Sequence, residues 1–200
     1  MGTRRPYGSS AVNNPLLILQ TLDKHLGHAF ELTLFGRAAL ALGYLQHRPE
    51  HETTQDVDAI IPLTQLEALC ADERFWNARD ATNIALKSQG LYLTHLFTEV
   101  DVFLQPDWLG RRVRIVADLK WLTLFRPATI DLILTKMMRG ADREDLSDIE
   151  FLMKQEPVTE AELRAAFGRT RVPEIPELRD TFRAAQPKVL EIARSFASAR

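Results

Sequence analysis

Cysteine is nearly absent from this chain of 200 residues, because Cys70 is the only one. A single cysteine excludes an intrachain disulfide and any zinc site of the CxxC type. No apolar run reaches the roughly 18 residues that a membrane-spanning helix needs. The polar start of the chain also lacks the apolar stretch of a signal peptide. The sequence therefore predicts a cytoplasmic protein with no membrane partner.

The chain also lacks an excess of charge of either sign. It has 25 Lys and Arg residues against 27 Asp and Glu residues, a formal net charge of -2. No global field then draws it to nucleic acid or to anionic lipid, so any site for a polyanion must be local. HExxH, GxGxxG, GxSxG and phosphate-loop motifs are missing as well.

The apolar pattern divides the chain into a mixed part and a helical part. Residues 1–12 predict a flexible tail, 13–126 an α/β core, and 127–200 a helical region packed on that core. Predicted helices of the core cover 16–30, 37–47 and 63–89 with a break near Asn77, and predicted strands cover 31–35, 57–61, 91–97, 99–104 and 120–127. The expected fold class is α/β, or α+β, with a mixed sheet flanked by helices and a C-terminal helical annex.

Three aspartates in or beside predicted strands form the first candidate site. Asp56 and Asp58 lie two residues apart at the start of the strand 57–61, so their side chains point to the same face. Asp101 lies among apolar residues in the predicted strand 99–104, where a carboxylate needs a partner. If the two strands pair side by side, the three carboxylates meet and can hold the two metal ions of a phosphoryl-transfer site. Oxygen ligands of this kind favour Mg²⁺.

Gly36 supplies a second feature, because it joins the strand 31–35 to the helix that follows. A glycine at this turn permits close approach of the backbone, and a helix start presents free N–H groups to phosphate. Arg37 comes next, and its guanidinium suits bidentate contacts with phosphate. The same side chain could instead fill the pocket and block it.

Two segments carry a resemblance to a known superfamily. FGRAALALGYL (35–45) with TTQDVDAII (53–61) resembles the first motif of the DNA polymerase β-type nucleotidyltransferases, closest to the minimal bacterial branch that includes AbiEii-like toxins. LILTKMMRGADREDLSDIEFLM (132–153) resembles the downstream helix pair of that branch. On this mapping Lys136, Asp145 and Asp148 take the positions of a conserved lysine and a DxxD.

The resemblance implies an activity and a set of roles. It implies transfer of a nucleoside monophosphate from an NTP to a protein or RNA acceptor, with two Mg²⁺ ions, or Mn²⁺, as cofactors. It assigns the metal ions and the catalysis to Asp56, Asp58 and Asp101. Contacts with the nucleotide would come from Gly36, Arg37, Lys136 and Asp148. A toxin–antitoxin or phage-defence role, with an antitoxin as partner, belongs to the same expectation.

Other interpretations stay open at this point. Lys136 can be a solvated helix lysine, and Asp145 can serve the start of a helix capped by Asp142. The whole fold can persist as a nucleotide-binding or protein-interaction module without catalysis. A helical scaffold with acidic strand ends on its surface is the third alternative.

Overall fold

One five-stranded mixed sheet organises the protein, for which a computed structural model describes residues 13–198. The tail expected at 1–12 lies outside the described residues. The strand order is β3-β2-β1-β5-β4. The strands are β1 (Phe30–Phe35), β2 (Asp56–Ile61), β3 (Tyr92–Thr98), β4 (Val113–Ile115) and β5 (Leu122–Arg126). β1 runs antiparallel to β2 and parallel to β5, while β2 and β3 are parallel.

The two faces of the sheet differ in what they bury. Leu32 and Leu34 of β1, with Val57 and Ala59 of β2, are buried in the main apolar core. Side chains alternate along a strand, so Asp56, Asp58 and Ile60 belong to the opposite face. That face meets a smaller apolar cluster of Ile60, Val102, Leu104 and Trp108. Asp56 and Asp58 therefore lie at the start of β2 on the face of the sheet that carries less apolar packing.

Helices before β3 cover the first face. They are α1 (Asn14–Leu26), α4 (Leu63–Ala71) and α5 (Glu73–Leu86). α1 starts at an Asn13 cap whose side chain accepts from the Leu16 N–H, and α5 starts at a similar Asp72 cap. The Asp23 carboxylate on α1 accepts three backbone N–H bonds at the start of β5. These bonds fix the position of β5 beside β1.

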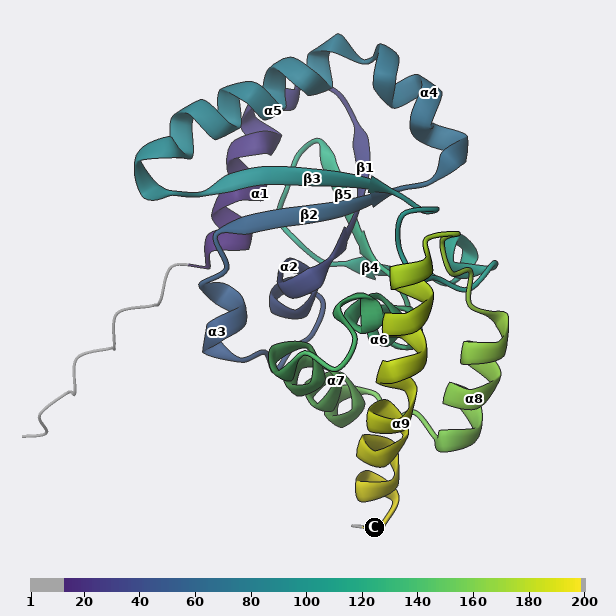
Figure 1. The fold of residues 1–200 in the computed structure, drawn as a ribbon. Helices are drawn as coiled ribbons and strands as arrows, with labels where there is room; N and C mark the ends of the chain where they lie inside the picture. Colours follow the sequence, from purple (N-terminus) through teal and green to yellow (C-terminus); the bar gives the residue numbers. More distant parts are fainter. Residues whose placement is uncertain (1–12, 199–200) are drawn as a thin grey trace, which may run out of the picture.

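The C-terminal helices group on the other side of the molecule from α4 and α5 (Figure 1). They are α6 (Thr129–Lys136), α7 (Arg143–Gln155), α8 (Glu160–Arg169) and α9 (Pro176–Ser198). Ile133, Leu152 and Val189 from this group belong to the same buried cluster as Leu34 of β1. The helical region thus shares the core of the sheet, and no helix in the described part of the chain is long and apolar enough to cross a membrane.

The mixed α/β class is confirmed, and four local predictions are corrected. The helix expected at 37–47 ends early as α2 (Gly36–Leu42), and the expected loop 47–55 contains a short helix, α3 (Pro49–Glu52). The helix break falls at Asp72 and not near Asn77, because Asp72 caps α5. Apart from these corrections, the structure adds β4, whose three residues carry too little pattern to be predicted.

The fourth correction concerns 99–104, which is a turn and not a strand. Asp101 Oδ2 accepts hydrogen bonds from the backbone N–H and the hydroxyl of Thr98, at 2.8 and 2.6 Å. Glu99 accepts from the indole N–H of Trp108 and from the backbone N–H of Leu63. Side chains that bond to nearby backbone in this way compete with a strand ladder, so β3 ends at Thr98.

Candidate functional site

A cleft of about 400 Å³ opens where the end of β1, the start of β2 and the α6–α7 connection meet. Five of the seven predicted site residues line it: Gly36, Arg37, Asp56, Asp58 and Lys136. Residues from three separate elements, α2, β2 and α6, thus come together. Asp101 and Asp148 are not part of the lining.

Asp56 and Asp58 form an acidic pair on one wall of the cleft. The Thr54 hydroxyl donates to Asp56 Oδ1 at 2.8 Å, and the Thr94 hydroxyl and His95 Nδ1 lie 3.2 Å from Asp58 Oδ1. Within residues 13–198, neither carboxylate has a Lys or Arg ion-pair partner. Burial raises the pKa of Asp58 above its usual value, and the neighbouring Asp56 charge raises it further. The pair therefore carries negative charge that a ligand cation would neutralise.

Gly36 stands at the turn from β1 into α2, in contact distance of this pair. Its φ of 62° lies in the left-handed region, where other residues are strained. A Cβ built here would meet Asp58 Oδ2 at 3.8 Å, an ordinary contact. The backbone conformation of the turn thus favours glycine, while the close approach of a ligand to Gly36 stays a prediction.

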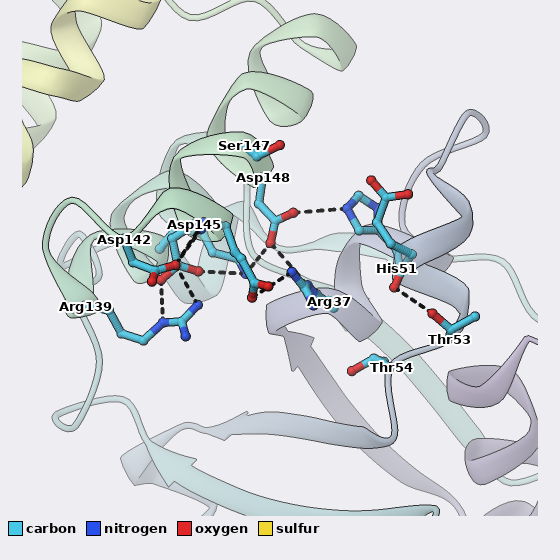
Figure 2. A network of polar contacts seen from close by, with 12 residues as sticks. Arg37, His51, Thr53, Thr54, Arg139, Asp142, Asp145, Ser147 and Asp148 are labelled. Carbon is cyan, nitrogen blue, oxygen red and sulfur yellow. Dashed lines mark hydrogen bonds and ion pairs between the residues drawn. The ribbon is translucent and has the colours of Figure 1, made fainter.

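A second wall of the cleft holds the cations, and carboxylates already pair with them (Figure 2). Lys136 Nζ donates to Asp148 Oδ2 at 2.6 Å and to Asp145 Oδ1 at 3.2 Å. Arg37 Nη2 donates to Glu144 Oε2 at 3.1 Å. Lys136 is nearly buried, so the interpretation of a solvated helix lysine is wrong. The cleft thus combines an acidic wall without Lys or Arg partners in the described part of the chain with a wall of ion pairs.

Asp148 lies behind the cations and not in the cleft. Its carboxylate is 2% exposed, accepts from Lys136 and from His51 Nε2 at 3.1 Å, and lies 3.7 Å from Arg37 Nε. Burial alone would raise its pKa, but the hydrogen bond from His51 and the Lys136 ammonium outweigh burial and lower the pKa to about 2. Asp148 therefore orients Lys136 and Arg37, and the predicted direct contact with nucleotide is replaced by a positioning role.

His51 was missed as a member of this arrangement. The sequence places it in a polar loop, whereas the structure buries it completely in α3 with its ring against Phe151. Its Nδ1 has no hydrogen-bond partner among the described residues. No local signal marks this histidine, because its partner Asp148 is 97 residues away in the sequence.

Asp101 does not reach the acidic pair, which corrects the predicted triad. β2 and β3 run parallel, with Asp56 opposite Tyr92 and Ile61 opposite Thr98. Asp101 follows the end of β3 and so lies at the other end of the sheet from Asp56. Its carboxylate caps the turn at Thr98 instead.

A β-bulge places two other residues beside Asp58. Val57 pairs with Leu93 and Ala59 pairs with Leu96, so Thr94 and His95 together face the single residue Asp58. A bulge of this kind redirects side chains and is common beside functional sites. The place expected for a third carboxylate is thus taken by a hydroxyl and an imidazole, which no sequence pattern indicated.

Asp145 and an apolar wall complete the cleft. Asp145 accepts from Arg139 Nε at 2.6 Å as well as from Lys136, and its N–H is capped by Asp142 as the helix interpretation predicted. Three partly exposed apolar side chains line the side of the cleft next to the acidic pair: Phe35, Phe97 and Met138.

No family model, no curated protein and no solved structure matches this chain. The site must therefore be judged by its own chemistry. Among residues 13–198, no group of three or more His, Cys, Asp or Glu side chains is arranged to hold a metal ion. Mg²⁺ commonly binds through one or two carboxylates plus substrate phosphates, and the Asp56–Asp58 pair fits that donor set.

Proposed function

We propose that the chain is a nucleotidyltransferase that binds an NTP with a divalent cation in the cleft of Asp56 and Asp58. One observation carries the proposal. Two carboxylates without a Lys or Arg partner in the described part of the chain share the cleft with a wall that contains Arg37 and Lys136. A phosphate chain with its metal ion complements both walls, because it offers a cation to the first and anions to the second.

The cation, held by Asp56 and Asp58, would neutralise phosphate charge and lower the pKa of the attacking hydroxyl. Arg37, with a partly exposed side chain, binds a phosphate group after it leaves Glu144. Lys136, fixed by Asp148, presents a point charge from the same wall. Gly36 gives the turn its shape.

In the reaction, the acceptor oxygen attacks the α-phosphorus of the NTP. The bond from that phosphorus to the bridging oxygen breaks, pyrophosphate leaves, and the hydroxyl proton passes to water. Asp101 has no part in this step, because it lies beyond the end of β3.

A second candidate is nucleotide binding without transfer. The position of Asp101 favours it, since the acidic wall keeps two carboxylates where three were expected. The existing ion pairs of Arg37 and Lys136 also favour this candidate. A phosphate ligand must compete there with Glu144, Asp145 and Asp148.

Calorimetric titration with ATP, CTP, GTP and UTP, each with and without Mg²⁺, tests both candidates. The Asp56→Asn/Asp58→Asn double variant removes the acidic wall, and Asp101→Asn is the matched control because it changes an exposed aspartate outside the cleft. We expect binding that needs Mg²⁺, that the double variant loses and that the control keeps.

Transfer is then measured with α-labelled NTP and pools of protein and RNA as acceptors. Label in an acceptor together with released pyrophosphate supports the first candidate. Binding without pyrophosphate release supports the second. A well-folded wild type that binds no NTP overturns both.

A further inference from the structure

We infer that the apolar wall of the cleft, formed by Phe35, Phe97 and Met138, binds the base of the nucleotide. This inference rests on the proposed function and adds a recognition element to it. It makes the aromatic base, and not only the phosphate chain, part of what the cleft selects.

The wall belongs to the same sheet face as the acidic pair. Phe35 is directly opposite Asp58 across the antiparallel β1–β2 ladder. Phe97 is paired with Ile60, which follows Asp58 by two residues and so shares its face. A ligand that reaches the two carboxylates therefore lies next to both rings.

The two rings form a fixed corner. Their centroids are 5.4 Å apart with an interplanar angle of 85°, an edge-to-face contact. Both pack against the second apolar cluster, and Met138 from the 3₁₀ turn η3 (Met137–Arg139) packs there too. Packing from behind holds the rings in place, so a ligand does not have to order them.

A planar aromatic group is the best occupant for this corner. All three side chains remain partly exposed toward a cleft whose other lining is mostly charged. Aromatic rings and a thioether favour contact with a flat ring over contact with water. Phosphates bound at Arg37 and Lys136 would leave the base of the same molecule to meet this wall.

The chemistry of the wall also sets its selectivity. No charged group or amide belongs to it, so hydrogen-bond readout of the base is absent from the three side chains themselves. Stacking tolerates every base but grows with ring area. We expect ATP and GTP to bind more tightly than CTP and UTP.

The test compares ATP with inorganic tripolyphosphate, each with Mg²⁺, in calorimetric titrations. The wild type is expected to bind ATP about 5- to 150-fold more tightly than tripolyphosphate, the range that stacking of one base spans. Phe97→Leu, which keeps an apolar side chain but removes the ring, is expected to close most of that gap. Phe97→Tyr is expected to keep it.

Phe30→Leu is the matched control, because Phe30 stacks on Phe75 at 4.4 Å on the other face of the sheet. It should leave both affinities unchanged. Equal affinity of the wild type for ATP and tripolyphosphate overturns the inference and leaves the metal–phosphate site standing. An equal loss of both affinities in Phe97→Leu also overturns it, since the side chain then acts through the fold. A folded wild type that binds neither ligand overturns the proposed function and the inference together.

Discussion

Carboxylates occupy two places at the cleft, on its wall and behind its cations, and they differ in their partners. The acidic pair, Asp56 and Asp58, has hydroxyl and imidazole contacts but no Lys or Arg partner in the described part of the chain. In the Asp148 network, which we define as Asp148 with His51, Lys136 and Arg37, the lysine and the arginine neutralise the carboxylate and His51 adds a hydrogen bond.

We infer from this difference that the acidic pair is available to a ligand, whereas Asp148 fixes the positions of neighbouring side chains. Unpaired like charges destabilise a fold, and proteins often accept that cost at functional sites. A buried carboxylate with cations on several sides gives a rigid position. The pKa shifts agree with this division, because the pKa of Asp58 is raised while that of Asp148 falls to about 2. Five predictions on four variants test the comparison, from the largest expected change in stability to the smallest.

Asp148→Asn should give the largest loss of unfolding free energy. It leaves Lys136 and His51 buried without their shared anion. Breaking a buried ion pair commonly costs about 3 kcal/mol or more of unfolding free energy. Chemical denaturation at pH 7 measures this, with Asp101→Asn as the exposed control. A loss no larger than that of the control would contradict the network.

The same variant should change the acid dependence of stability. The folded pKa of Asp148, about 2, is lower than the ordinary value of 3.8. Its stabilising contribution is therefore present above about pH 4 and is lost as the pH falls toward 2. The shift corresponds to about 2 kcal/mol. Denaturation midpoints between pH 2 and 5 should fall more steeply for the wild type than for Asp148→Asn, and parallel curves would argue against the assignment.

Asp58→Asn should stabilise the fold at neutral pH, in contrast to Asp148→Asn. A raised folded pKa means that the ionised carboxylate opposes folding at neutral pH, and that this penalty disappears as the pH falls below the folded pKa. We expect a gain of about 1 kcal/mol at pH 7, with little gain at pH 3. The variant should also lose any stabilisation by Mg²⁺ or Mn²⁺ in thermal melts. Destabilisation at pH 7 would show that the carboxylate is a structural group.

Arg37→Ala should change stability by less than about 1 kcal/mol, because its ion pair with Glu144 is exposed. The variant should weaken phosphate binding by a larger free energy, since one charged hydrogen bond contributes about 1.5–3 kcal/mol. We expect at least tenfold weaker binding of tripolyphosphate with Mg²⁺. Tighter binding would mean that the arginine blocks the cleft, the alternative that the sequence raised.

His95→Asp should change stability least, by a few tenths of a kcal/mol, because the side chain is largely exposed. It places a third carboxylate beside Asp58 through the bulge. We expect tighter binding of Mn²⁺ and Mg²⁺, measured by calorimetry without nucleotide. Thr94→Ser, which keeps the neighbouring hydroxyl, is the control. Unchanged cation affinity would show that the bulge directs residue 95 away from the cation.

The sequence by itself determined the local elements of this protein. The compact apolar segment 57–61 predicted β2, and the two-residue period of any strand predicted the common face of Asp56 and Asp58. The apolar pattern of 16–30 predicted α1, and the helical character of the chain after 127 followed from its apolar spacing. The turn at Gly36 was also visible in the sequence.

Only the tertiary structure decided which distant residues meet. The position of Asp101, away from Asp56 and Asp58, depends on the parallel pairing of β2 and β3, which local sequence pattern does not encode. The bulge that turns His95 toward Asp58 depends on cross-strand register, and the burial of His51 depends on α7 lying against α3. Register and packing are set by the sum of many long-range contacts, so the acidic pair could be predicted from the sequence while its surroundings could not.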